Sequence, residues 1–490
     1  MGLKILSLSA EVAPFAKTGG LADVCGALPK YLRKMGHDVR VAMPAYQMIE
    51  HEYHTTNKYG LETLPGQLWV PTGPGVHPAG GFRGTLPGSD VPAYFIAEWN
   101  LFGRPQIYGY GDDAYRFAFF AKAVVELLLA LDWKPDIVHA HDWHAAPFVT
   151  WLATAGSADE RFRSDAGFPI PTLFTIHNLA HQGRTHWKIF DYMGIQTYSL
   201  NEESFDEVNF MARGIYHATM INTVSPTYAR EIMTPSLGAH MDKLLHSRAF
   251  DVHGILNGID YEVWNPATDA HIAHQFDADT LDAKIFNKRD LQARAGLPQR
   301  DDVPLVALVS RLDFQKGLDL MGHVIHQLLN SFAGSEAQFI VLGTGADEYE
   351  QMFTRLAHYH KDKMRAYLQY DASLSQLVYA GADIFLMPSR FEPCGLGQLI
   401  AMRYGTVPVV RATGGLVDTV QDGHTGFSFS DYTADAFWNA LYRAIQTYIR
   451  NPGHWREIQR NGMLANFSWE ASAERYAEVY AWAISRARGW

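Results

Sequence analysis

Apolar positions follow two periods along the chain, and the alternation of the two predicts strands and helices in turn. Residues 4–9 form a short apolar run, and residues 21–35 place apolar side chains on one face of a helix. Residues 38–43 are apolar again at strand length. A strand, a helix and a second strand in this order predict a βαβ unit, and therefore a parallel sheet with right-handed crossovers.

The same rhythm continues through the first half of the chain. Residues 57–92, rich in glycine and proline, predict an inserted set of loops and hairpins. Beyond them the pattern predicts strands at residues 136–140, 172–176 and 220–224, and helices at residues 115–133, at 204–217 and from Pro226 onward, with Ser225 as the helix cap.

The second half repeats the alternation after a polar connector that ends near Asp301. Strands are expected at residues 305–310, 338–342, 383–387 and 407–410, and helices at residues 317–329, 373–380, 396–404 and 469–490. The pattern predicts an α/β protein with two doubly wound, Rossmann-like domains facing a central cleft. We expect the domains at residues 1–252 and 253–468, followed by a C-terminal helix at residues 469–490.

Composition limits the class of protein. Hydrophobic residues make up 47% and charged residues 19%, as in an ordinary globular protein, and the net charge of -11 argues against a nucleic-acid binder or a binder of acidic membranes. The most apolar helix, at residues 115–133, is interrupted by charges, so no membrane span is expected. Two cysteines and a start without a secretory signal predict a reducing, cytoplasmic location.

Lys17 leads into Gly19 and Gly20 directly after the first strand. Glycines at this point let a backbone approach a ligand, and a lysine beside a helix start favours phosphate. The spacing matches neither a dinucleotide fingerprint nor a Walker loop, and a tight turn with a solvent lysine is the alternative. A similar string at residues 413–418 has Ala412 in place of the lysine, so we interpret it as a related turn without a phosphate site.

Two further strand ends carry candidate chemistry in the second half. Arg311 and Lys316 follow one strand and can grip a diphosphate, although a pair of surface charges is the alternative. Glu392 follows another strand and is succeeded by a helix start whose backbone groups suit an anion; the carboxylate could instead cap its own helix. A ligand with both hydroxyls and phosphates, such as a nucleotide sugar, satisfies both groups.

Histidines gather at two strand ends of the first half. His139 and His141 share a strand face and could be metal ligands, but Asp142 beside Trp143 is equally typical of a sugar-contacting loop, which we favour. His177 and Asn178 end the next strand; a surface histidine is the alternative. The DxD pattern at residues 277–279 lies in the polar connector, away from any strand end, so we expect no metal there.

Seven motifs in order resemble the bacterial glycogen synthase and plant starch synthase family, over almost the whole chain. They read KTGGLAD, HAHDWHA, TIHN, NGID followed by WNP, SRLDFQKG, SRFEPCGLGQ and TGGLVD. The resemblance implies the two-domain glycosyltransferase-B fold, with the C-terminal helix crossing back onto the first domain. It implies transfer of glucose from ADP-glucose or UDP-glucose to the non-reducing end of an α-1,4-glucan, glycogen or starch-like, with retention of configuration and without a metal or pyridoxal phosphate.

The resemblance also implies roles for single residues. Lys17, Arg311 and Lys316 would face the diphosphate, while Glu392 and His177 would complete the catalytic set. The substrate-binding residues implied in this way are Gly19, Gly20, Asp23, Asp142, Trp143, Asn178, Asn257, Tyr370 (stacked on the base), Cys394, Gly395, Leu396 and Gly397.

Two positions refine the resemblance. Ile400 stands where sucrose-phosphate synthases and related retaining transferases carry a second glutamate, which favours the glycogen and starch branch. Gly397 stands where the family often has threonine or asparagine, which implies the loss of one side-chain contact to the nucleotide phosphate. The alternatives are a nucleotide-sugar epimerase of the same fold and a non-catalytic glucan-binding protein. The sequence leaves the donor base and the oligomeric state open.

Overall fold

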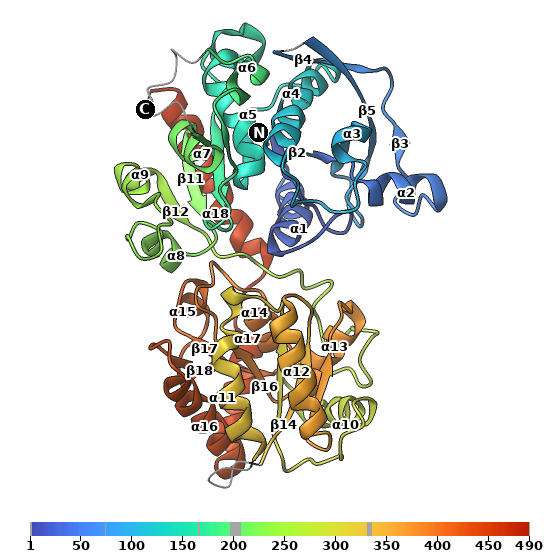
Figure 1. Ribbon diagram of the computed structural model, residues 1–490, viewed down its shortest axis with the longest axis vertical. Helices are drawn as coiled ribbons and strands as arrows, with labels where there is room; N and C mark the ends of the chain where they lie inside the picture. Colours follow the sequence, from blue (N-terminus) through green and yellow to red (C-terminus); the bar gives the residue numbers. More distant parts are fainter. Residues whose placement is uncertain (1, 74, 165–166, 197–206, 331–335, 490) are drawn as a thin grey trace. The chain divides into compact units, whose positions relative to one another are not determined.

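The computed structural model describes residues 2–73, 75–164, 167–196, 207–330 and 336–489 (Figure 1). The chain forms two compact units. The first holds the residues up to Val224, Ala229–Ile255 and the segment from Trp469 onward; the second holds Ser225–Tyr228 and Leu256–Ser468.

The first unit is built on a largely parallel sheet. Among the described residues it has 10 strands, and its parallel part runs in the order β12-β11-β8-β7-β1-β2-β6. Strand order reverses between β1 and β7, and ligands of such sheets bind beyond the carboxyl ends of the strands at this point. The parallel strands are β1 (Lys4–Leu8), β2 (Asp38–Pro44), β6 (Pro92–Ala97), β7 (Ile137–His141), β8 (Thr172–Ile176), β11 (Met220–Thr223) and β12 (Val252–Gly254).

Antiparallel strands extend one edge of this sheet and confirm the hairpins predicted for residues 57–92. They are β3 (Glu62–Thr63), β4 (Leu68–Thr72) and β5 (Gly75–Thr85). A separate antiparallel pair is formed by β9 (Arg184–His186) and β10 (Glu207–Asn209).

Helices α1 (Gly20–Lys34) and α18 (Trp469–Ala487) pack on each other and on the parallel strands, although they are far apart in sequence (Figure 1). Val24 and Leu28 of α1 share a buried apolar cluster with Trp469 and Val479 of α18 and with Ile5 of β1. The other helices of the first unit are α2 (Gln47–Thr55), α3 (Trp99–Phe102), α4 (Asp113–Ala130), α5 (Asp142–Ala153), α6 (Ile189–Met193), α7 (Phe210–His217) and α9 (Asp242–Ser247). Helix α8 (Pro226–Glu231) begins in the stretch Ser225–Tyr228, which belongs to the second unit.

The second unit is a parallel sheet in the order β15-β14-β13-β16-β17-β18, with the reversal between β13 and β16. Successive residues of a strand face opposite sides, so Val306 and Leu308 enter one core while Leu305 and Ala307 enter the other. The strands are β13 (Leu305–Val309), β14 (Gln338–Leu342), β15 (Met364–Tyr367), β16 (Ile384–Met387), β17 (Val407–Arg411) and β18 (Phe427–Phe429).

Helices cover both faces of this sheet. One core includes residues of α11 (Leu318–Leu329), α12 (Asp347–Tyr359), α16 (Ala434–Arg450) and α17 (Pro452–Leu464). The other includes residues of α10 (Lys284–Arg294), α13 (Ala372–Gly381), α14 (Gly397–Arg403) and α15 (Gly415–Thr419). Helices packed on two faces of a parallel sheet with one reversal confirm the doubly wound arrangement.

Several local predictions need correction. The helix expected over residues 204–217 begins only at Phe210, because Asn209 caps it by accepting from the Ala212 N–H at 3.1 Å, and Glu207–Asn209 form strand β10. Residues 204–206 lie outside the described residues. Asp142 and Trp143, predicted in a loop, are the first residues of α5. Helices α10, α12, α16 and α17 fall in stretches for which the pattern gave no assignment.

Over the described ranges, every helix is too short or too polar to cross a lipid bilayer.

Candidate active site

Glu11, which the sequence analysis missed, organises the loop between β1 and α1. Its buried carboxylate accepts hydrogen bonds from the Thr18 hydroxyl at 2.7 Å, the Tyr108 hydroxyl at 2.7 Å and the Gly19 N–H at 3.2 Å, and also from the Thr18 N–H. The Gly19 amide, expected to face phosphate, therefore already has an anionic partner. The sequence signal that could have identified Glu11 is the position of this carboxylate, just beyond the end of the first strand.

Lys17 projects from this loop and forms an ion pair with Asp23 at 2.6 Å. Both side chains are about one-third exposed, at 36% and 34%. Asp23 lies in the first turn of α1, which begins at Gly20. Lys17, which is predicted to contact phosphate, thus lies beside the start of α1, and its ammonium group is paired with the carboxylate of Asp23.

Asp142 ties the end of β7 to the end of β8. Its carboxylate accepts the N–H of His177 at 2.7 Å and the N–H of Asn178 at 3.5 Å. Its backbone is left-handed at φ 57, a conformation uncommon outside glycine and frequent at functional sites. Burial raises the pKa of Asp142 to about 7 and lowers the pKa of His177 to about 3, so the imidazole is neutral.

Trp143 follows Asp142 in the first turn of α5 and is buried against Gly183. A Cβ atom at Gly183 would lie 2.1 Å from the indole ring, and φ there is +63, so this position requires glycine.

The described residues contain no group of three or more His, Cys, Asp and Glu side chains arranged to hold a metal ion. Asp277 instead accepts from Thr280 in an exposed turn.

The strand ends of the second unit bring Lys316 and Glu392 into contact. Nζ of Lys316 lies 2.7 Å from Oε2 of Glu392, which also accepts from the Ser389 hydroxyl at 2.9 Å. The pair is largely buried, with exposed fractions of 17% and 7%. Gly317 permits this approach, because a Cβ there would lie 2.0 Å from the Pro388 carbonyl oxygen. The Glu392 side chain does not cap the helix that follows it, α14, since no side chain makes a capping hydrogen bond there.

Arg311 follows strand β13, as Lys316 does, but it pairs with Asp313 at 3.3 Å, and its side chain is 55% exposed. Tyr370 is 78% exposed, so its ring is open to a stacking partner. Asn257 is buried, and among the residues the structure describes its Oδ1 atom has no hydrogen-bond partner. An unsatisfied buried acceptor is costly, and a ligand hydroxyl would satisfy it.

The loop from Cys394 to Gly397 is held by Gln398. Its side-chain amide donates to the carbonyl oxygens of Cys394 at 3.1 Å and Gly395 at 3.0 Å, and to the Thr419 hydroxyl at 3.1 Å. Burial raises the pKa of the Cys394 thiol to about 12, so it stays protonated. Leu396 precedes helix α14, and no side chain caps this helix.

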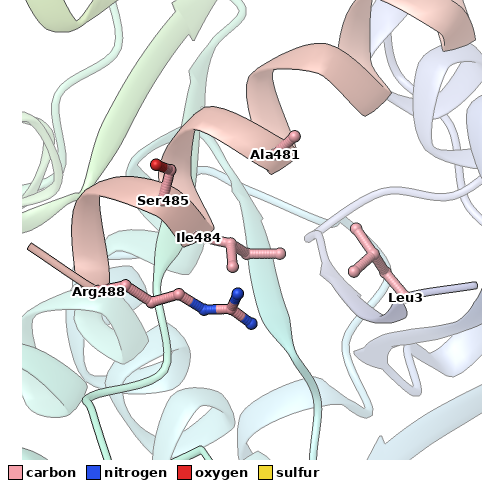
Figure 2. Close-up of a pocket in the computed structure, with 5 residues that line it drawn as sticks. All are labelled: Leu3, Ala481, Ile484, Ser485 and Arg488. Atoms are coloured by element: carbon pink, nitrogen blue, oxygen red, sulfur yellow. The ribbon is translucent and has the colours of Figure 1, made fainter. Parts of the chain in front are cut away.

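One pocket lies apart from these residues, at the end of α18 and beside the residue that precedes β1 (Figure 2). Arg488 is the cationic side chain in an otherwise mostly apolar lining. The residues that line the pocket are Leu3, Ala481, Ile484, Ser485 and Arg488.

Acid should destabilise the protein through its buried histidines. Burial lowers the pKa of His139, His141, His144 and His177 below 6.5, so the folded state resists the protons that the unfolded chain binds. Their stabilising contribution is complete above pH 6.5 and is lost progressively as the pH falls below that value, by about 1.4 kcal/mol per pH unit for each unmatched proton. Asp142 acts in the opposite direction: because burial raises its pKa, protonation of Asp142 stabilises the folded state as the pH falls.

The check is the free energy of unfolding by urea between pH 8 and pH 4. It should fall below pH 6.5, and His144→Gln should reduce the slope. An unfolding free energy that rises continuously toward pH 4 would contradict the prediction.

Gly397→Thr should destabilise the second unit. A Cβ at Gly397 would lie 3.0 and 3.2 Å from ring carbons of Phe385 and 3.4 Å from the Tyr379 hydroxyl, so the phenyl ring must shift. Overpacking of this kind costs about 1 to 3 kcal/mol in unfolding free energy. Combining it with Phe385→Leu should recover part of this loss, as measured by urea denaturation; a double variant less stable than both single variants would argue against the steric explanation.

Comparisons with known proteins agree with the motifs. Residues 4–247 match the family model described as starch synthase catalytic domain, and residues 290–462 match glycosyl transferases group 1. A glycogen synthase of Moorella thermoacetica is 46% identical, covering 99% of this chain and 98% of that protein. A glycogen synthase of Thermotoga maritima is 42% identical, covering 99% of each.

Two solved structures are similar to the chain over almost its whole length. The catalytic domain of starch synthase IV from Arabidopsis thaliana, bound to ADP and acarbose, superposes with a TM-score of 0.90 at 34% identity, covering 99% of this chain and 100% of that one. A sucrose-phosphate synthase from Thermosynechococcus elongatus shares the fold, with a TM-score of 0.61 at 18% identity over 99% of this chain and 100% of that one.

Proposed function

Because the chain belongs to the glycogen and starch synthase family of glycosyltransferases, we propose that it transfers glucose from ADP-glucose to the non-reducing end of an α-1,4-glucan, with retention of configuration. The contact between Lys316 and Glu392 at the strand reversal of the second unit carries this proposal. ADP is favoured over UDP because the related Arabidopsis structure holds ADP. The two free, buried cysteines suit a reducing cytoplasm.

In this proposal the second unit holds the donor. Lys316 and Arg311 bind the diphosphate, while Glu392 binds glucose hydroxyls and keeps the Lys316 ammonium in place. A carboxylate and an ammonium in contact suit a ligand that offers hydroxyls beside phosphate. Tyr370 stacks on the base. Hydroxyl and phosphate contacts also come from Asn257, Cys394, Gly395, Leu396 and Gly397.

In the first unit, Lys17 binds diphosphate in this proposal, with the amide of Gly20 at the start of α1 beside it. His177 contacts the donor sugar as a neutral imidazole, which can donate one hydrogen bond and accept another. Asp142 positions it through the backbone N–H. Contacts to the sugars also come from Trp143 and Asn178.

The reaction breaks the bond between the anomeric carbon and a phosphate oxygen, so negative charge grows on the leaving diphosphate. Lys17, Arg311 and Lys316 stabilise that charge, and each well-placed donor lowers the barrier by about 3 to 4 kcal/mol. Retention by the route of retaining hydrolases needs a carboxylate nucleophile opposite the leaving group. In this proposal the leaving phosphate instead accepts the acceptor's proton on the same face of the sugar.

The test is incubation of the purified protein with ADP-glucose or UDP-glucose, each with and without glycogen. Growth of the polymer with release of ADP supports the proposal. Conversion of the sugar without glycogen would indicate an epimerase instead, and binding of glycogen without turnover would indicate a glucan-binding protein.

A further inference from the structure

His177 is held from behind by a second buried histidine. Its Nε2 atom lies 3.0 Å from Nδ1 of His141, and Nε2 of His141 lies 3.3 Å from the Ser7 hydroxyl. All three side chains are buried, so loss of one partner would leave a polar atom unpaired in the protein interior. His141 therefore restricts both the ring orientation and the tautomer of His177.

His141 is packed in turn against His139. Their ring centroids are 3.9 Å apart, with the ring planes inclined by 39°. His139 is itself fixed at both nitrogens: Nδ1 lies 2.8 Å from the Tyr480 hydroxyl and Nε2 lies 2.6 Å from the Thr175 hydroxyl. A ring bonded at both nitrogens cannot rotate without losing a buried hydrogen bond.

The direction of these hydrogen bonds follows from proton counting. The Thr175 hydroxyl donates its one proton to Oδ1 of Asn222, so it must accept from Nε2 of His139. Because burial keeps His139 neutral, its Nδ1 atom carries no proton and accepts from the Tyr480 hydroxyl. The amide of Asn222 donates to the Tyr476 hydroxyl at 3.2 Å.

Helix α18 therefore supplies both ends of one directed chain of hydrogen bonds. Tyr476 and Tyr480 are one turn apart, fully buried, and reach into the middle of the parallel sheet. Apolar residues alone could dock α18, as Trp469 and Val479 do. The added polar chain fixes where His139 lies, and through ring contact it fixes His141.

We propose that His141 is a positioning residue for His177, and that Tyr480 of α18 sets the orientation of His141 through His139. The inference rests on the proposed function, in which His177 contacts the donor sugar. It adds that residues of β7 and α18 with no substrate contact of their own tune the transfer step. Misplacement of a reacting group by about 1 Å can cost on the order of a hundredfold in rate.

Two substitutions of His141 separate positioning from packing. The amide of Asn reaches the place of Nδ1, so His141→Asn keeps the contact to His177 and loses that to Ser7. The amide of Gln reaches the place of Nε2, so His141→Gln does the reverse. In transfer from ADP-glucose to glycogen we expect His141→Gln to lower kcat by roughly tenfold or more, with donor KM within about twofold.

His141→Asn should stay within about threefold of wild-type kcat. Each variant loses one of two buried hydrogen bonds, so their melting temperatures should fall by similar amounts. Equal kcat values for the two variants, or a greater loss for His141→Asn, would overturn the role of His141.

The contribution of α18 is tested by Tyr480→Phe against Tyr476→Phe. Each removes one buried hydroxyl from the same helix, but only the first removes the partner of His139. We expect kcat to fall about threefold to tenfold for Tyr480→Phe and to stay close to wild type for Tyr476→Phe. Indistinguishable kcat values for the two would overturn the part assigned to Tyr480.

A spectroscopic measurement keeps the inference separate from the proposed function. The protein is labelled with 15N-histidine, and the ring-nitrogen signals of His177 are identified as those that are missing from the His177→Ala variant. These signals should shift in Tyr480→Phe and His141→Gln. Unchanged signals would overturn the coupling even if the enzyme is active. A wild-type protein that transfers no glucose would refute the proposed function, while shifted signals would still support the coupling.

Discussion

Lys316→Ala should lower kcat for glucose transfer from ADP-glucose by about 10²- to 10³-fold, because it removes a cation directed at the leaving diphosphate. It also leaves Glu392 buried, with the Ser389 hydroxyl as a remaining donor. Removing one partner of a buried ion pair destabilises a protein by about 3 to 5 kcal/mol, and less here because Lys316 is 17% exposed. Rates measured at saturating donor, well below the melting temperature, separate the two effects.

Arg390→Ala is the matched control for this substitution. Arg390 lies in the loop after β16, whose backbone contacts the loop of Lys316 through the hydrogen bond from the Arg390 N–H to the Gln315 carbonyl oxygen at 2.8 Å, and it also forms an ion pair of 2.7 Å, with Asp319. It has no place in the proposed donor site, so kcat should stay within about twofold of wild type. A similar loss of kcat in both variants would show that general disturbance of the loops after β13 and β16, and not loss of the Lys316 charge, slows the reaction.

Lys17→Ala should lower kcat by about 10²-fold or more with almost no change in stability. Its pair with Asp23 is about one-third exposed on both sides, and exposed ion pairs contribute only about 0.2 to 1 kcal/mol to the unfolding free energy. A large kinetic effect without a change in melting temperature would assign the lysine to substrate, since a structural role would move both.

Lys34→Ala serves as the comparison, because Lys34 is an exposed lysine at the other end of the same helix, α1. It should leave both kcat and melting temperature near the wild-type values. The diphosphate assignment itself fails if Lys17→Ala and Lys316→Ala each turn over ADP-glucose at the wild-type rate.

Apolar periodicity was sufficient for the strands that build both sheets, because parallel strands are buried on both faces and read as continuous apolar runs. It failed for α10, whose buried face is polar. Lys284 there donates to the carbonyl oxygens of Tyr379, Ala380 and Tyr404. A helix that docks through a buried ammonium has no apolar stripe, so its position follows only from the carbonyl groups it meets.

Most of the candidate site residues were chosen because they follow the ends of predicted strands, since loops at the carboxyl ends of parallel strands gather at one edge. The partners of those residues could not be predicted. Glu11 reads as an ordinary acidic residue until the fold brings Tyr108 and Thr18 to it. His139 and His141 could be interpreted as metal ligands from the sequence, but His139 forms a hydrogen bond with a tyrosine hundreds of positions away in the chain.

Placement of α18 in the first unit has a consequence for synthesis of the chain. The apolar face formed by Ile5, Val39 and Ile137 is completed by side chains of α18, yet all of Leu256–Ser468 is translated in between. At 5 to 20 residues per second, that interval is on the order of 10 to 40 s. During this time the nascent first unit exposes an unfinished core, so it needs protection from aggregation while the second unit is made.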